Sequence, residues 1–184
     1  GDMVFEMTRS YNEVPFRLRN HLERLYAGIK ILEIDCGLDI DEMEAATIET
    51  VEINKDRMPE GIDYQIMHNV SNGALGLYES VFPGGIKPTI TINVWPLTQH
   101  LAGIADYYET GVHSVVPAQH SVPARYIDPK MKNRSRIFYQ MANLQAQRVD
   151  PKAYPLLTDE DGFITEGTGN NFFMVKDGVI YTPE

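Results

Sequence analysis

Residues 166–183 read Glu166-Gly-Thr-Gly-Asn-Asn-Phe-Phe-Met-Val-Lys-Asp-Gly-Val-Ile-Tyr-Thr-Pro183. Two apolar runs flank Asp177-Gly178, and an Asp-Gly pair in that setting is a strong signal for a tight β-hairpin. In front of the hairpin, Glu166 stands beside a glycine-rich turn. The stretch therefore predicts a turn that carries one carboxylate, followed directly by two short paired strands.

Two interpretations of Glu166 are open. A carboxylate within Thr-Glu-Gly-Thr-Gly is normally a turn residue, and Asn170 and Asn171 are common turn formers. Alternatively, the glycines allow the backbone to approach a ligand while the carboxylate pairs with a protonated heterocyclic nitrogen. In that second case the two asparagines supply amides close to the ligand.

An unusually basic segment lies upstream, where five of the 16 Lys and Arg residues gather. They are Arg125, Lys130, Lys132, Arg134 and Arg136. The segment is either a solvated basic loop or an anion site. In an anion site, neighbouring cations disfavour the charged form of Lys132. An amine without its extra proton can attack a carbonyl and form a Schiff base.

Arg24 is the third candidate, within a pattern that predicts an amphipathic helix. His21 lies three positions earlier and Gly28 four positions later, so the three residues share one helix face. Arg24 is either an exposed side chain paired with an acid such as Glu23, or an anion ligand beside the space that Gly28 leaves. The remaining histidines lack metal-ligand spacing, so no metal site is predicted.

The rest of the chain alternates between strand and helix patterns, which predicts a mixed α/β fold. Period-two patterns predict strands at residues 3–11, 64–70, 88–94 and 112–116, with further short strands within 154–182. Helical spacing predicts helices at residues 17–33, 39–55, 98–109 and 135–148, and in the last helix Ile137, Met141, Ala142 and Leu144 are expected to face inward. Gly37 should stop the first helix, and Asp39 should cap the second.

Composition limits the classes of function. The chain has 184 residues, is 43% hydrophobic and carries a net charge of −10. This charge argues against general binding to nucleic acid or to anionic membranes, since both need a positive field. A single cysteine excludes an internal disulfide, and no apolar run reaches transmembrane length. A cytoplasmic location is the expectation.

Five segments together resemble the class IV (fold-type IV) pyridoxal-phosphate enzymes. This family includes branched-chain aminotransferases, D-amino acid aminotransferases, R-selective amine transaminases and aminodeoxychorismate lyases. The resemblance rests on Gly1-Asp-Met-Val-Phe-Glu-Met-Thr-Arg9, Phe16-Arg-Leu-Arg-Asn-His-Leu-Glu-Arg-Leu25, Tyr107-Tyr-Glu-Thr-Gly-Val112, Lys132-Asn-Arg-Ser-Arg136 before Ala142 and Ala146, and Glu166 to Pro183. Their order and spacing are those of the family.

The resemblance implies a cofactor, pyridoxal 5′-phosphate, and roles for particular residues. Lys132 would be the catalytic residue, which holds the cofactor as a Schiff base and moves the proton. Lys130 is a nearby competitor, but Lys132 keeps the spacing to the two alanines. Glu166 would pair with the pyridine nitrogen and Arg24 with the phosphate. Further cofactor contacts are implied for Gly167, Thr168 and Asn171.

An architecture and an activity are implied as well. Residues 1–117 would form a small α/β domain without its first strands, 118–129 a linker, and 130–184 the N-terminal part of a strand-rich, pseudo-barrel cofactor domain. The implied activity moves an amino group between an amino acid or amine and a keto acid, in a homodimer. The alternatives are a lyase of the aminodeoxychorismate type, or a truncated non-catalytic relative, because relatives extend beyond both ends of this chain.

Two departures from the family concern substrate binding and the lysine segment. Branched-chain enzymes carry Tyr-x-Arg where this chain has Tyr64-Gln65-Ile66, so their usual anchor for the substrate carboxylate is missing. Arg9 and Tyr64 are the candidates for substrate binding here. Many branched-chain relatives also place a tyrosine shortly after the lysine, where the nearest counterpart in this chain is Arg136.

Overall fold

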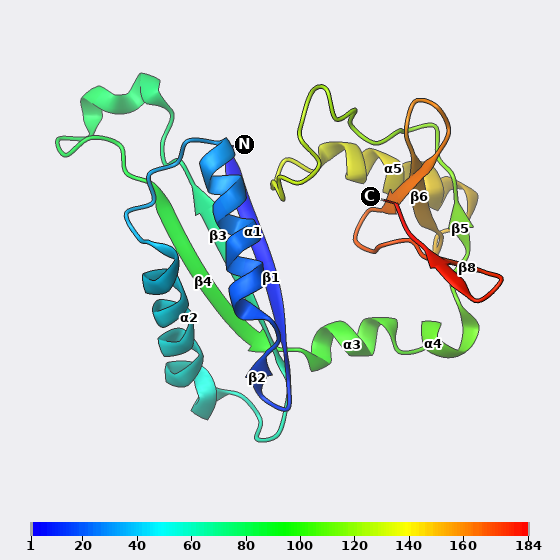
Figure 1. Ribbon diagram of the computed structural model, residues 1–184, viewed down its shortest axis with the longest axis horizontal. Helices are drawn as coiled ribbons and strands as arrows, with labels where there is room; N and C mark the ends of the chain where they lie inside the picture. The colour runs from blue at the N-terminus through cyan, green and yellow to red at the C-terminus, as the bar shows by residue number, and fades with distance from the viewer. Residues whose placement is uncertain (1, 184) are drawn as a thin grey trace. The chain divides into compact units, whose positions relative to one another are not determined.

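The computed structural model describes residues 2–183, which divide into two compact units (Figure 1). The first unit comprises residues 2–104 and 129–135, and the second comprises 105–128 and 136–183. Residues 118–128, most of the expected linker, belong to the second unit, where the Ser121 N–H donates to the Thr158 carbonyl oxygen (2.9 Å). The division into domains at 1–117, 118–129 and 130–184 remains a prediction.

An antiparallel sheet with the strand order β2-β1-β3-β4 forms the framework of the first unit. The strands are β1 (Met3–Tyr11), β2 (Val14–Pro15), β3 (Tyr64–Ser71) and β4 (Thr89–Pro96). β1 and β3 pair continuously from Met3↔Ser71 to Arg9↔Gln65. The three strands predicted in this part of the chain are confirmed, with small differences at their ends.

One face of this sheet is buried beneath α1 (Leu18–Ile31) and α2 (Ile40–Asn54), the two helices beside it in Figure 1. Alternate residues of a strand point to the same face. The inward residues of β1 and β3 are each at most 2% exposed, namely Val4, Glu6, Thr8, Ser10, Tyr64, Ile66, His68 and Val70. Leu22, Leu25 and Met43 pack near Val4, and Val51 packs near Tyr64. Polar side chains are therefore buried together with the apolar ones.

The ends of the two helices follow local backbone chemistry. α1 ends at Ile31, so the predicted stop at Gly37 is wrong. Glu33 adopts a left-handed conformation (φ 52°), and the Ile34 N–H donates back to the Ile29 carbonyl oxygen (3.1 Å), which closes the helix early. The Asp39 cap of α2 is confirmed. Two 3₁₀ helices follow, η1 (Lys55–Arg57) and η2 (Gly76–Val81).

The second unit contains a three-stranded sheet, a separate hairpin and two helices. These elements are β5 (Ser114–Val115), β6 (Tyr154–Thr158), β7 (Ile164–Gly167), β8 (Met174–Lys176), β9 (Val179–Tyr181), α4 (Tyr107–Thr110) and α5 (Ile137–Val149). β5 pairs with β6 in parallel, and β7 pairs with β6 antiparallel. The predicted hairpin is confirmed: Asp177 (φ 51°) and Gly178 (φ 76°) form the turn between β8 and β9, as a type I′ turn requires.

Two helix predictions need correction. The predicted helix 98–109 is two helices, α3 (Thr98–Ile104) and α4. In α5 the expected inward positions Ile137, Met141 and Leu144 are exposed, although Ala142 is buried as predicted. The buried residues of α5 are Tyr139, Ala142 and Ala146. Tyr139 and Ala142 form a core cluster with Leu157 of β6, so the short alanine side chain meets the strand and the larger aliphatic residues lie outside.

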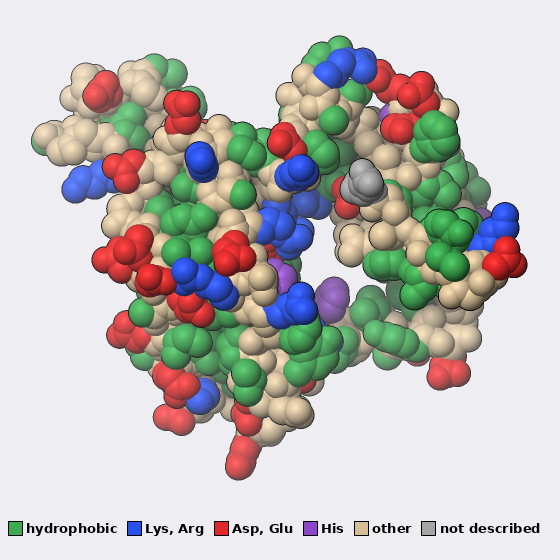
Figure 2. All heavy atoms as spheres, viewed as in Figure 1, with side chains coloured by type: hydrophobic (Ala, Val, Ile, Leu, Met, Phe, Trp, Pro, Cys, Tyr) green, Lys and Arg blue, Asp and Glu red, His purple; other side chains and the backbone are tan. Residues whose placement is uncertain are grey.

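The visible surface of the first unit carries many Asp and Glu side chains in Figure 2, in keeping with the net charge of −10. Of the helices in residues 2–183, none is both long enough and apolar enough to span a membrane.

Candidate functional site

Arg24 on α1 forms a two-point contact with Glu6 on β1. The Arg24 Nε donates to Glu6 Oε2 (2.6 Å), and Nη2 donates to Oε1 (2.7 Å). The Glu6 side chain is 0% exposed, whereas that of Arg24 is 51% exposed. The buried carboxylate therefore fixes one edge of the guanidinium, and the rest of that group reaches the surface.

Glu6 stays ionised although it is fully buried. Burial alone raises the pKa of a carboxyl group, because the charged form loses its hydration. For Glu6 the hydrogen bonds from His21, Arg24 and the Met7 N–H outweigh burial and lower the pKa to about 2. His21 Nδ1 lies 3.2 Å from Glu6 Oε1. The predicted shared face of His21 and Arg24 is confirmed, and Glu6 is the group that it meets.

Lys132 lies in a segment that pairs with the first residues of β1. The Phe5 N–H donates to the Lys132 carbonyl oxygen (3.0 Å), and the Arg134 N–H donates to the Met3 carbonyl oxygen (3.0 Å). Lys132 Nζ lies 4.9 Å from the centroid of the Phe5 ring. The backbone of β1 thus anchors Lys132 at Phe5, next to the residue that holds Arg24.

Glu166 lies on β7 in the second unit and accepts a hydrogen bond from the Tyr139 hydroxyl of α5. The Tyr139 side chain is 9% exposed. Burial, followed by the contact with Glu166, raises the pKa of Tyr139 above its usual value, so this hydroxyl keeps its proton and donates. The sequence analysis did not identify Tyr139. The one signal that could have found it is its position as an aromatic residue shortly after the candidate lysine.

The turn after Glu166 is closed by contacts of its own. The Gly167 N–H donates to the Asn170 carbonyl oxygen (2.9 Å). A Cβ atom on Gly167 would lie 2.6 Å from Asn170 Nδ2, a contact closer than real Cβ atoms make. Thr168 Oγ1 donates to Asn143 Oδ1 of α5 (2.8 Å), while Asn171 is exposed. A side chain at position 167 would therefore require the exposed Asn170 side chain to move.

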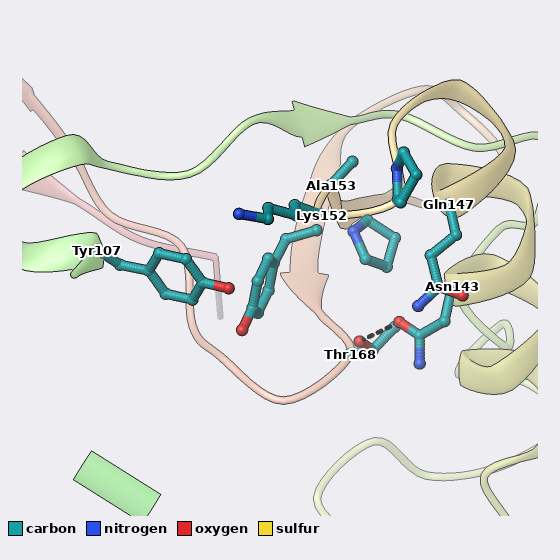
Figure 3. A pocket seen from close by; sticks show the side chains of 9 residues that line it. Tyr107, Asn143, Gln147, Lys152, Ala153 and Thr168 are labelled. Carbon is teal, nitrogen blue, oxygen red and sulfur yellow. Dashed lines mark hydrogen bonds between the residues drawn. The ribbon is translucent and has the colours of Figure 1, made fainter. Parts of the chain in front are cut away.

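A cavity of about 380 Å³ lies beside Thr168 within the second unit (Figure 3). Figure 3 shows Asn143, Gln147 and Lys152 among the residues that line it, and the dashed contact joins Thr168 to Asn143. Tyr107 and Tyr154 meet edge to face at its margin, with ring centroids 5.5 Å apart. The lining is thus largely polar.

The two candidates for substrate binding have structural partners. Arg9 Nη2 lies 3.6 Å from Asp63 Oδ2, and the guanidinium stacks on the Tyr11 ring at 3.9 Å. Tyr64 is 2% exposed, and its hydroxyl donates to the Glu13 carbonyl oxygen (2.8 Å). The Tyr64 contact holds the turn between β1 and β2, and Arg9 joins β1 to the residue in front of β3. A role in substrate binding stays a prediction for both residues.

The predicted site residues fall into two groups, one in each unit. Arg24 and Lys132 belong to the first unit, and Glu166, Gly167, Thr168 and Asn171 belong to the second. Sequence reasoning also missed Glu6. An acidic residue on the inward side of an apolar strand was the signal for a buried ion pair. Within residues 2–183, no group of three His, Cys, Asp or Glu residues could hold a metal ion.

Comparison with known proteins identifies the family. Residues 3–184 match the family described as Amino-transferase class IV. The chain belongs to the class IV aminotransferases. The resemblance inferred from the five segments is therefore confirmed.

Two curated relatives carry aminotransferase names. One, from Methanocaldococcus jannaschii, is provisionally named a branched-chain-amino-acid aminotransferase and is 34% identical over 183 residues, which are 100% of this chain and 59% of the relative. The other, D-alanine aminotransferase of Bacillus licheniformis, is 27% identical over 99% of this chain and 59% of the relative. The chain thus spans about 59% of the length of these proteins.

Solved structures match with similar coverage. A branched-chain amino acid aminotransferase complexed with N-(5′-phosphopyridoxyl)-L-glutamate is 26% identical to this chain with a TM-score of 0.77, and the match covers 98% of this chain and 57% of that structure. The branched-chain aminotransferase of Thermoproteus uzoniensis, solved with norvaline, has the same identity and TM-score and is covered over 58% of its length. The predicted fold class, a mixed α/β fold of the fold-type IV kind, is confirmed.

Proposed function

We propose that the protein is an aminotransferase that uses pyridoxal 5′-phosphate to move an amino group between an amino acid or amine and a keto acid. Family membership supports the reaction class. The names of its relatives and the phosphopyridoxyl compound in one of the matched structures support the reaction and the cofactor. The relatives that carry these names are longer than the present chain, which spans about 59% of their length.

The observation that carries the proposal is the anchoring of Lys132 and Arg24 to consecutive residues of β1, Phe5 and Glu6. Pyridoxal phosphate requires an amine for its aldehyde and a cation for its phosphate. Because Glu6 takes Nε and one N–H of Nη2, both Nη1 hydrogens of Arg24 remain able to donate to a phosphate. The first unit therefore supplies both kinds of donor that the cofactor requires, an amine and a cation.

The cofactor supplies the electron sink for a carbanion at the substrate carbon when it is bound. The chain's own residues would bind and orient it. Arg24 would hold the phosphate through charge-assisted hydrogen bonds, and Glu166 would accept a hydrogen bond from the protonated pyridine nitrogen. Lys132 Nζ would provide the covalent attachment and carry the proton. Gly167, Thr168 and Asn171 would contribute the turn next to Glu166.

The first prediction tests the covalent attachment. The purified protein is incubated with pyridoxal 5′-phosphate, and wild type is expected to develop the visible absorption band of a lysine-bound cofactor. Lys132→Ala removes the only proposed attachment point, so this band should be lost. Reduction with borohydride followed by peptide mass analysis should find the added phosphopyridoxyl mass on Lys132.

The matched control is Lys130→Ala, because Lys130 lies two residues away in the same basic segment. This variant should keep the visible band at the wild-type level. If the band survives in Lys132→Ala and disappears in Lys130→Ala, the cofactor is attached to Lys130 and the assignment to Lys132 is wrong. A wild-type protein without any band contradicts the proposed cofactor itself.

The reaction class has its own test. An aminotransferase stops after one half-reaction unless a keto acid accepts the amino group, whereas a lyase that eliminates does not need an acceptor. Product formation that continues without a keto acid would favour the lyase. We also propose a homodimer, on the basis of the family resemblance, and a cytoplasmic location, on the basis of the single cysteine and the absence of an apolar run of transmembrane length. Light scattering of the purified protein tests the dimer.

A further inference from the structure

α5 contacts the Glu166 turn at two points. Tyr139 and Asn143 are four residues apart, and side chains with this spacing lie on one face of a helix. Tyr139 donates to Glu166 Oε1, and Asn143 accepts from Thr168. Glu166 and Thr168 are two residues apart at the end of β7, and Gly167 lies between them. One helix face therefore contacts two polar side chains of this turn, Glu166 and Thr168.

The Tyr139 ring is itself held on several sides. It packs in a core cluster with Ala142 and Leu157, and its centroid lies 4.2 Å from that of Phe138. The Arg136 guanidinium carbon lies over the ring, 4.7 Å from its centroid. A buried ring with these neighbours has few alternative rotamers. The position of its hydroxyl is therefore set by the core of the second unit.

The contact leaves Glu166 with a defined accepting atom. A protonated tyrosine hydroxyl donates one hydrogen bond, and here it goes to Oε1. Glu166 is exposed, so its acceptor capacity toward a ligand lies chiefly on Oε2. A carboxylate fixed at one oxygen presents the other in a restricted direction, which is what a directional contact to a ring N–H needs.

We propose that Tyr139, with Asn143 as a second contact, is a positioning residue that orients the Glu166 carboxylate toward the pyridine nitrogen of the bound cofactor. The inference rests on the proposed function and adds a residue that acts through Glu166. Tyr139 holds Oε1, and Oε2 would be the oxygen that accepts from the pyridine N–H. Asn143 holds Thr168 and so keeps the end of β7 in place.

The test is a double-mutant cycle on cofactor affinity. Tyr139→Phe removes one oxygen and keeps the ring, so the core should be preserved. Its dissociation constant for pyridoxal 5′-phosphate is expected to rise about tenfold, as is typical when an orienting partner is lost. Glu166→Gln should raise the constant at least as much. Because Tyr139 acts through Glu166, the double variant should be no weaker than Glu166→Gln alone.

A spectroscopic measurement separates positioning from a general structural effect. A protonated pyridine ring lowers the pH at which the lysine-bound cofactor loses its imine proton. Tyr139→Phe should therefore move the pH midpoint of the visible band upward. The matched control is Tyr108→Phe, which removes the hydroxyl of an exposed tyrosine of the second unit that does not line the cavity beside Thr168. Its affinity and midpoint should equal those of wild type.

The possible failures are distinguishable. If wild type forms no lysine-bound band, the proposed function fails. If the band forms but Tyr139→Phe keeps wild-type affinity and midpoint, the inference about Tyr139 is wrong while the proposed function stands. Losses that add fully in the double variant also overturn it, because Tyr139 would then act independently of Glu166. Should Tyr139→Phe melt well below wild type, Asn143→Ala tests the same helix face, with a smaller expected loss of affinity.

Discussion

At the scale of single residues, the ion pair between Glu6 and Arg24 is asymmetric. Glu6 is 0% exposed and Arg24 is 51% exposed. A buried charge that loses its partner retains its desolvation penalty, whereas a charge at the surface can be hydrated instead. Removing Arg24 and removing the charge of Glu6 should therefore lower the free energy of unfolding by different amounts.

The second prediction follows from this asymmetry. Arg24→Ala leaves a fully buried carboxylate with only His21 and the Met7 N–H, and it should lower the free energy of unfolding by about 3 kcal/mol. Glu6→Gln leaves a half-exposed guanidinium and should cost clearly less. Urea denaturation at neutral pH measures both. Arg19→Ala, which removes exposed contacts to Asp41 and Glu44, is the control and should change little. A larger loss for Glu6→Gln than for Arg24→Ala would contradict the asymmetry.

The candidate ligands themselves could be predicted from the sequence, but the residues that hold them could not. Lys132, Glu166 and Arg24 stand in recognisable motifs. Glu6 lies in the family-like segment of residues 1–9 and Tyr139 follows the candidate lysine, but their importance comes from contacts between distant segments: Glu6 meets Arg24 on α1, and Tyr139 meets Glu166 on β7. A local pattern of polarity can mark such a residue as buried, but it does not identify the residue's partner.

At the scale of elements, α2 begins with a complete capping box. Asp39 accepts from the N–H groups of Asp41 and Glu42, and the Glu42 side chain accepts from the Asp39 N–H (2.8 Å). Three backbone donors at the start of the helix thus have partners, which isolated helix ends lack. The buried residues of this helix, which pack toward the sheet, are Met43, Thr47 and Val51.

The third prediction concerns this cap. Asp39→Ala removes the acceptor for two backbone N–H groups and should lower the free energy of unfolding by about 1 kcal/mol. The matched control is Glu49→Ala, an exposed acid in the middle of the same helix. It should be nearly neutral, since alanine is a strong helix former. Equal losses in the two variants would mean that charge on α2, rather than capping, accounts for the effect.

Element positions were largely predictable, whereas the orientation of α5 was not. β1, β3 and β4 have clear period-two patterns, and Asp39 and Asp177-Gly178 are local signals of an N-cap and a turn. α5 has apolar residues around most of its circumference, so periodicity favoured Ile137, Met141 and Leu144 as inward residues. Its buried face is instead set by close packing of Ala142 and Tyr139 near Leu157, a long-range constraint.

At the scale of the whole molecule, the chain's path is the least predictable feature. Residues 129–135 return to the first unit after an excursion into the second, and they pair with the first residues of β1. The sequence of this segment is basic and has no strand pattern, so it predicted a loop or an anion site. Its pairing depends on the free edge of β1 beside Met3 and Phe5, at the opposite end of the sequence.

The core of the first unit also holds titratable groups whose effect extends to global stability. His68 is 0% exposed, and burial lowers its pKa to about 4, against a smaller opposing effect of the Glu6 charge. Thr47 Oγ1 donates to the Met43 carbonyl oxygen (2.6 Å), so it accepts from His68 Nε2 (2.8 Å). His68 Nδ1 has no hydrogen-bond partner among residues 2–183. His68 is thus buried in its neutral form.

The fourth prediction is a stepwise loss of stability in acid. Between pH 6.5 and 4 the unfolded chain binds a proton at His68 that the folded chain does not, so the free energy of unfolding should fall by about 3 kcal/mol as the pH is lowered. Glu6 acts next: its folded pKa of about 2 lies below the ordinary 4.5, so stability present above pH 4.5 is lost as the pH falls toward 2.

Urea denaturation at pH 7, 5.5 and 4.5 covers the first window, in which His68 titrates. His68→Gln should flatten that window, and exposed His100→Gln should leave it unchanged. A wild-type curve that is flat from pH 7 to 4.5 would show that His68 does not stay neutral in the folded core.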